Sequence, residues 1–142
     1  ENDLTSFGRS GERRDLNRER FDENTLNNSL RDPNSPPSRN IELLKHAMSV
    51  RSSLKAFDPE ESMTCLSKGR SDFVVICRGA HEYKVWAIHN MTNKKLSFSL
   101  SDNIKVESTP NSHLIDLLNN IIISDNQMEL SPYSVHWLIH KK

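Results

Sequence analysis

The chain has 142 residues, enough for one domain, and its 19 basic and 19 acidic side chains balance to a formal net charge of zero. Nucleic-acid-binding proteins need a surplus of lysine and arginine to displace counterions from phosphates, so this balance argues against that class. No stretch approaches the roughly 18–20 apolar residues of a membrane span, and no apolar signal segment opens the chain. We therefore expect a cytoplasmic protein whose partners are neither nucleic acid nor membrane.

The apolar residues are distributed unevenly. Only six of the 49 lie in residues 1–40, so this segment cannot form a hydrophobic core of its own. Residues 1–22 are polar and rich in arginine, with no helical or strand period, which predicts an irregular loop or disorder. The chain also begins at Glu1 within this loop-like segment. Two explanations stay open: a leader has been removed, or the sequence is the C-terminal part of a longer protein.

Two helices are predicted after this segment. A short helix opens after Asp22, which can cap it ahead of an acidic first turn, and ends at Asp32–Pro33. A longer helix is capped by Ser38 or Asn40, after the stiff 34–37 turn. Its apolar positions are spaced 4, 3, 4 and 3 residues apart and form one stripe, namely Leu43, Ala47, Val50, Leu54 and Phe57. Such a stripe needs another element to cover it.

From residue 61 the pattern changes to short β-like runs separated by turns. Strands are predicted at residues 63–66, 73–77, 83–89, 96–100, 114–118, 121–123 and 133–140. The clearest period of two is in Leu96–Leu100, with apolar side chains on one face and hydroxyl groups on the other. Short strands at this spacing predict an antiparallel sheet or a small sandwich. The joint between helix and β module falls near residue 58.

Few residues form a known chemical motif. The sequence has no phosphate-binding glycine loop, no His-Glu-x-x-His pair and no nucleophile elbow. Four potential zinc ligands can be aligned but lack the close pair typical of zinc sites: Cys65, Cys77, His81 and His89. We therefore expect no metal and no cofactor. The two cysteines are expected to be reduced and mostly buried.

The most informative polar run is residues 11–18, Gly-Glu-Arg-Arg-Asp-Leu-Asn-Arg. Arginine forks with aspartate and asparagine side chains offer several directed hydrogen bonds from one loop, which suits sugar hydroxyls or an oxyanion. An arginine-rich run is also typical of a solvated surface or a structural ion-pair cluster. On the residues alone, both interpretations stay open.

This run, with Asn2–Leu4 before it, resembles the Asn-Asp and Thr-Gly-x-x-Arg-Asp-Ile-Asn-Arg-His pattern of sucrose phosphorylases and their glucosylglycerol and glucosylglycerate relatives. These enzymes belong to the α-amylase superfamily, glycoside hydrolase family 13. Val85–Thr92 is similar to the family's Ala-Leu-His-Asn-Val-Ser strand and turn, Leu114–Leu118 to its Asp-Leu-Leu segment, and Leu130–Leu138 to its closing Pro-Tyr-x-Val-x-Trp-Leu. Departures from the loop pattern occur at Ser10, Arg13, Leu16, Glu19 and Arg20.

The resemblance implies an α+β fragment. Residues 1–57 would be the last active-site loop and last helix of a (β/α)8 barrel, and residues 58–142 the C-terminal antiparallel β-sheet domain. Such enzymes transfer glucose by double displacement with an aspartate nucleophile and a glutamate acid, after which phosphate takes up the glucosyl group. These carboxylates would lie upstream of Glu1. No catalytic residue is therefore expected here, and the chain alone is expected to be inactive.

The same match implies four substrate-binding residues. Arg14 would line the pocket near the acceptor or phosphate, and Asp15, Asn17 and Arg18 would hold the shape of the loop. The implied partners are a sugar or sugar phosphate and inorganic phosphate, and the chain would pack on the missing barrel. The alternative is a free-standing β-sheet module that binds carbohydrate or protein, with the first 40 residues as a disordered arm.

Overall fold

The computed structural model describes residues 4–12, 22–67, 69–105 and 113–141. The chain divides into two compact units, residues 1–45 and 46–142. The predicted joint between residues 57 and 58 refers to the domains of an intact parent enzyme and stays a prediction. Within the described ranges, no helix is both long enough and apolar enough to cross a membrane.

The first unit contains α1 (Leu4–Ser10), α3 (Glu23–Arg31) and the beginning of α4 (Pro36–Ser52). Helix α1 corrects the expectation that residues 1–22 are an irregular loop or disorder. The predicted cap of α3 is confirmed, because Asp22 Oδ2 accepts hydrogen bonds from the backbone N–H and the hydroxyl of Thr25, each at 3.0 Å. These bonds lower the pKa of the Asp22 carboxyl. The charged cap therefore supports the helix start at neutral pH.

Helix α4 begins earlier than the sequence predicted. Ser35 caps it, rather than Ser38 or Asn40, and the Ser35 hydroxyl accepts a hydrogen bond from the Ser38 N–H at 3.2 Å. Two prolines, Pro36 and Pro37, open the helix. They fit there because the first N–H groups of a helix have no partner within it.

The predicted apolar stripe is broken at the end of α4. The helix ends at Ser52, and the separate 3-10 turn η1 (Lys55–Phe57) carries Phe57 into a small core with Ala56 and Val85. The Phe57 ring lies against Trp137 of the last strand, with 4.7 Å between ring centroids. Helix α4 itself buries no residue.

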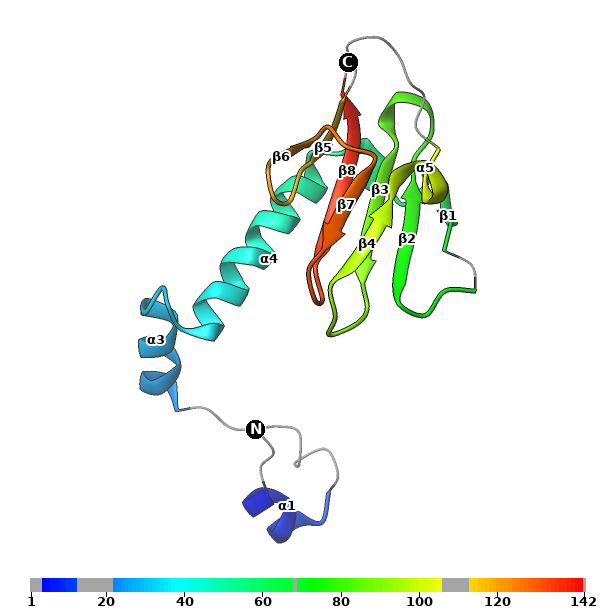
Figure 1. The fold of residues 1–142 in the computed structure, drawn as a ribbon. Coiled ribbons are helices and arrows are strands. Elements are labelled where there is room, and N and C mark those ends of the chain that lie inside the picture. The colour runs from blue at the N-terminus through cyan, green and yellow to red at the C-terminus, as the bar shows by residue number, and fades with distance from the viewer. Residues whose placement is uncertain (1–3, 13–21, 68, 106–112, 142) are drawn as a thin grey trace. The chain divides into compact units, whose positions relative to one another are not determined.

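The second unit contains two antiparallel sheets (Figure 1). The larger sheet has the strand order β1-β2-β3-β8-β5-β6. Its strands are β1 (Met63–Cys65), β2 (Phe73–Arg78), β3 (Val85–Asn90), β5 (His113–Asp116), β6 (Ile121–Ile123) and β8 (Val135–Lys141). The smaller sheet pairs β4 (Leu96–Ser99) with β7 (Gln127–Leu130), and short helical turns occur at η2 (His81–Tyr83) and α5 (Leu100–Asn103). The predicted antiparallel β module is confirmed.

The main core lies between the two sheets. Its most deeply buried apolar side chains come from both of them, namely Phe98, Leu130, Val75, Ile88 and Leu138. Phe98 of β4 also meets Phe73 of β2 edge to face, with 5.2 Å between ring centroids. Ser97 faces away from this core and is exposed, which confirms the period of two predicted for this strand.

Candidate functional site

The four residues implied for substrate binding, Arg14, Asp15, Asn17 and Arg18, lie outside the described residues. Their arrangement and their roles therefore stay predictions. The functional geometry that the structure does describe lies in the sheet unit.

The four side chains considered as zinc ligands are spread over different elements: Cys65 on β1, Cys77 on β2, His81 in η2 and His89 on β3. Cys77 lies opposite Trp86 and His89 opposite Val74, so the two side chains point to opposite faces of the sheet. In the part of the chain that the structure describes, no three His, Cys, Asp or Glu side chains are grouped to hold a metal ion.

Both cysteines are free, as predicted, but only one is shielded from solvent. Cys77 packs against the main core, and burial raises the pKa of its thiol, opposed by the charge of Lys84. Cys65 is exposed on the edge strand β1, which corrects the expectation of burial. A three-residue edge strand has no neighbour on its outer side to cover this side chain.

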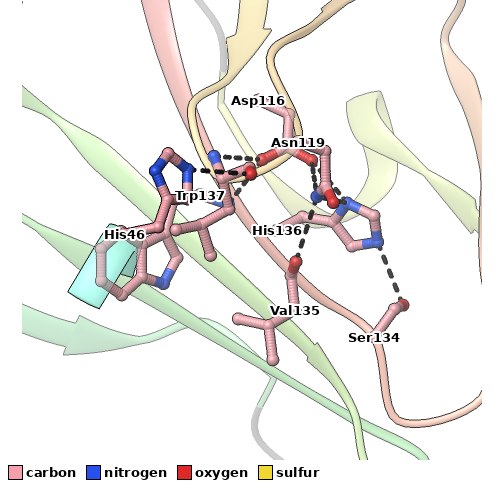
Figure 2. Close-up of polar contacts among 8 residues, drawn as sticks. His46, Asp116, Asn119, Ser134, Val135, His136 and Trp137 are labelled. Carbon is pink, nitrogen blue, oxygen red and sulfur yellow. Dashed lines mark hydrogen bonds and ion pairs between the residues drawn. The ribbon is translucent and has the colours of Figure 1, made fainter. Parts of the chain in front are cut away.

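A polar cluster lies where β5 ends and β8 begins (Figure 2). Asp116, the last residue of β5, is 1% exposed and pairs in register with Leu138. His136 is two residues from Leu138 and shares its face, which brings His136 Nδ1 to 2.7 Å from Asp116 Oδ2. His136 Nε2 lies 3.0 Å from the hydroxyl oxygen of Ser134. Ser134, His136 and Asp116 therefore form one continuous hydrogen-bonded series.

Three further donors fix the Asp116 carboxylate. Its Oδ1 accepts hydrogen bonds from the backbone N–H groups of Leu118 and Trp137, each at 3.2 Å, and its Oδ2 accepts one from the Asn119 amide at 2.6 Å. Burial alone would raise the pKa of Asp116, but the bonds from His136, Asn119 and Trp137 together lower it. An ionised carboxylate at this position favours the His136 tautomer with its proton on Nδ1.

The cluster also connects the sheet to the C-terminal half of α4. His46 Nε2 lies 3.1 Å from the carbonyl oxygen of Leu118, the residue whose N–H binds Asp116 (Figure 2). The turn between β5 and β6 is thus held from two sides, by His46 on the helix and by Asp116 on the strand.

A second buried polar side chain, Asn90, closes β3 and is 3% exposed. Its Nδ2 donates to the carbonyl oxygens of Lys94, Ser131 and Leu130 at 2.7, 2.8 and 3.2 Å. Its Oδ1 accepts from the N–H and the hydroxyl of Thr92 at 2.9 and 2.8 Å. Asn90 therefore joins the turn after β3 to the turn before β8.

His89 is expected to make the stability of the sheet unit fall in mildly acidic solution. It lies between Val74 and Val135 of the neighbouring strands, and burial, with a smaller effect from His136, lowers its pKa from 6.5. The unfolded chain then binds a proton more readily than the folded chain. This contribution to stability is present above the unfolded pKa and is lost as the pH falls through the lowered folded value.

The measurement is the urea midpoint between about pH 7 and pH 5. His89→Gln should flatten its pH dependence, whereas His81→Gln, at an exposed position, should leave the dependence in place. Equal slopes in the native chain and in His89→Gln would contradict this expectation.

The sequence did not indicate the pairing of Asp116 with His136. The one signal in the sequence was Asp116, a single acidic residue inside the apolar run Leu114–Leu118, because a buried charge requires a partner. The identity of that partner depends on the register between β5 and β8. The hydrophobic pattern fixes which face of each strand is buried, but registers that differ by two residues keep the same buried face.

Comparisons with known proteins give matches among solved structures. No family model matches the chain, and neither does any curated protein. A trehalose-6-phosphate hydrolase from Bacillus licheniformis is similar with a TM-score of 0.59 and 16% sequence identity, over 82% of this chain and 20% of that enzyme. Two mutant forms of the trehalulose synthase MutB are similar with a TM-score of 0.55 and 17% identity, over the same shares of each chain.

The chain has the fold of the C-terminal region of α-amylase-family enzymes. It spans about a fifth of the length of these enzymes. The match confirms the sheet part of the fold that the resemblance implied. The barrel part, the phosphorylase specificity and the substrate loop are not covered by this finding.

Proposed function

We propose that the chain is the C-terminal part of a retaining, α-glucosyl-transferring enzyme of the sucrose phosphorylase type, active in cytoplasmic carbohydrate metabolism. The observation that carries the proposal is the fold match over 82% of the chain to 20% of an α-amylase-family enzyme. The loop pattern at residues 11–18 supports the phosphorylase type, because it resembles the loop of those enzymes.

In this proposal the chemistry is divided between two parts of the parent enzyme. The nucleophilic aspartate and the acid glutamate stand on barrel strands outside this chain, flanking the scissile bond as a retaining mechanism requires. Arg14 presents its guanidinium to inorganic phosphate or to the acceptor sugar, since its paired N–H groups match phosphate oxygens. Asp15, Asn17 and Arg18 hold the loop that carries Arg14.

The surface of α4 supports packing on a further part of such an enzyme. Leu43, Leu44 and Met48 are 67%, 62% and 67% exposed, respectively, and they give the helix an apolar surface that the described chain does not cover. Burying such side chains contributes about 1.5–3 kcal/mol each. A barrel that covers α4 would gain this stabilisation.

The test compares the 142-residue chain with a longer chain that also encodes the proposed barrel. Glucose 1-phosphate and fructose are supplied, and free phosphate and disaccharide are measured. The longer chain should release phosphate and form disaccharide, and the short chain should do neither. Turnover by the short chain would contradict the absence of catalytic carboxylates.

The longer chain also tests the phosphorylase type and the role of Arg14. Given sucrose and phosphate, it should form glucose 1-phosphate, and Arg14→Ala should reduce phosphate use more than glucosyl transfer to water. Formation of free glucose or of trehalulose instead would place the enzyme with hydrolases or trehalulose synthases, the activities named for its structural neighbours. Equal losses with phosphate and with water would contradict the role of Arg14.

The alternative function is a free-standing β-sheet module that binds carbohydrate or protein. The observation that favours it is the separate compact unit of residues 46–142, which has its own core. Binding of the 142-residue chain to an immobilised glucan, without any longer chain, would support the module. Absence of binding, together with turnover by the longer chain, would support the enzyme.

A further inference from the structure

The Ser134, His136 and Asp116 side chains are graded in their exposure to solvent. The Asp116 side chain is 1% exposed, that of His136 is 14% exposed, and Ser134 at the turn before β8 is half-buried. Solvent or a small molecule therefore reaches the series from the serine end. The proposed glucosyl transfer uses none of these residues, so the inference below does not depend on it.

The atoms of the series are ordered for proton transfer. His136 Nδ1 lies 2.7 Å from Asp116 Oδ2 and Nε2 lies 3.0 Å from the Ser134 hydroxyl, so in the tautomer with its proton on Nδ1 the lone pair of Nε2 faces that hydroxyl. Asn119 and two backbone N–H groups hold the carboxylate, and the strand register holds the imidazole. A nucleophile, a base and a group that orients the base are the three parts of covalent acyl transfer.

A backbone donor lies next to the serine. Asn90 N–H donates to the Ser134 carbonyl at 3.0 Å, so the backbone carbonyl of Ser134 points toward β3. Successive residues of an antiparallel strand direct their backbone groups to opposite sides, so the Val135 N–H points away from β3. On that side β5 stops at Asp116, opposite Leu138, and gives Val135 no register partner. An N–H directly after the nucleophile is suitably placed to stabilise an oxyanion.

We propose that Ser134, His136 and Asp116 form an acyl-transfer site that hydrolyses small, uncharged carboxylic esters. Tyr133 beside the serine is 67% exposed and offers apolar surface to a short acyl group. Among the interactions of the described residues, Ser134 contacts no aspartate, glutamate, lysine or arginine side chain, which favours an uncharged substrate over an acidic one.

The reaction proceeds in two steps. The Ser134 oxygen forms a bond to the ester carbonyl carbon while its proton moves to His136 Nε2, and the leaving alcohol departs with that proton as its C–O bond breaks. Water then adds to the acyl carbon and gives a proton to Nε2, and the Ser134 oxygen leaves and takes that proton back. The net change is ester plus water to acid plus alcohol, with no redox step.

The test uses the complete chain, p-nitrophenyl acetate and a fluorophosphonate. The fluorophosphonate should label Ser134, located by peptide mass spectrometry, and p-nitrophenol release should fall at least about 100-fold in Ser134→Ala. Ser131→Ala is the matched control, because Ser131 is exposed three residues away and only its backbone carbonyl takes part in the contacts described here. Its rate should equal that of the native chain.

Two results would overturn the proposal. One is a native chain in which Ser134 takes up no more label than Ser131. The other is equal p-nitrophenol release by the native chain and Ser134→Ala, which would assign the hydrogen-bonded series a purely structural role. Labelling needs only the native chain, so the proposal stays testable even if a variant fails to fold.

Discussion

Asn90→Asp is expected to unfold at a far lower denaturant concentration than the native chain. The substitution removes the donor that serves three carbonyl groups and places a carboxylate oxygen against them in a buried position. Leaving buried carbonyls unpaired beside an uncompensated charge costs about 3–5 kcal/mol. This is a large part of the 5–15 kcal/mol that stabilises a typical domain.

Urea unfolding followed by tryptophan fluorescence measures this loss, since Trp86 and Trp137 both lie in the sheet unit. Asn93→Asp is the matched control, because Asn93 is exposed in the same turn and should change the midpoint little. The difference in urea midpoint between Asn90→Asp and the native chain should shrink in acid, because the new carboxyl is then protonated and regains one donor. If Asn90→Asp lowers the urea midpoint no more than Asn93→Asp does, the Asn90 contacts contribute little to stability.

Gly79→Ala is expected to destabilise the sheet unit almost as strongly. Gly79 has φ of +76°, and a Cβ built there would lie 2.8 Å from the Tyr83 carbonyl oxygen and 3.1 Å from Ala56 Cβ. The left-handed backbone costs an alanine about 1–2 kcal/mol, and crowding of this kind adds about 1–3 kcal/mol. The collision involves backbone atoms that cannot rotate away.

Gly69→Ala separates these two effects. Gly69 has φ of +79°, but no atom of the described residues lies within 4 Å of the added Cβ, so only the backbone cost applies. The two variants should therefore differ in unfolding free energy by the steric part alone, about 1–3 kcal/mol. Equal losses would show that the turn after β2 moves freely enough to relieve the crowding.

The sequence predicted some of the elements whose determinants are local, but it missed α1 (Leu4–Ser10). Asp22 caps α3 through the Thr25 N–H three residues away, and buried Phe98 follows exposed Ser97 in β4. Strand β7 was missed, because four residues, Gln127–Leu130, contain only two apolar positions and are too few to establish a period. It forms because Met128 pairs with Phe98 across the smaller sheet, and this partner is 30 residues away in sequence.

The prediction for the end of α4 was wrong for a different reason. The spacing places Leu54 and Phe57 on the same helical face as Val50, but the helix stops before both of them. Phe57 instead packs against Trp137 and Val85, and the Arg78 guanidinium donates to the Ala56 and Asp58 carbonyls on either side of it. Tertiary contacts of this kind override a local period, and no local pattern encodes them.

The candidate site could not be predicted for the same reason. Asp116 and His136 are 20 residues apart, and they meet only because β5 and β8 pair in one register. A shift of one residue would turn His136 to the opposite face. The family resemblance concerns Arg14 instead, because a loop motif carries no information on the contacts between strands.

Strand β8 occupies the place between β3 and β5, although it is the last strand along the sequence. Without β8, the other strands of the larger sheet form two separate parts, β1-β2-β3 and β5-β6, each with an open edge where β8 belongs. Open edges are templates for pairing with other chains. Until residues 135–141 pair with them, both edges are therefore open to strands of other chains.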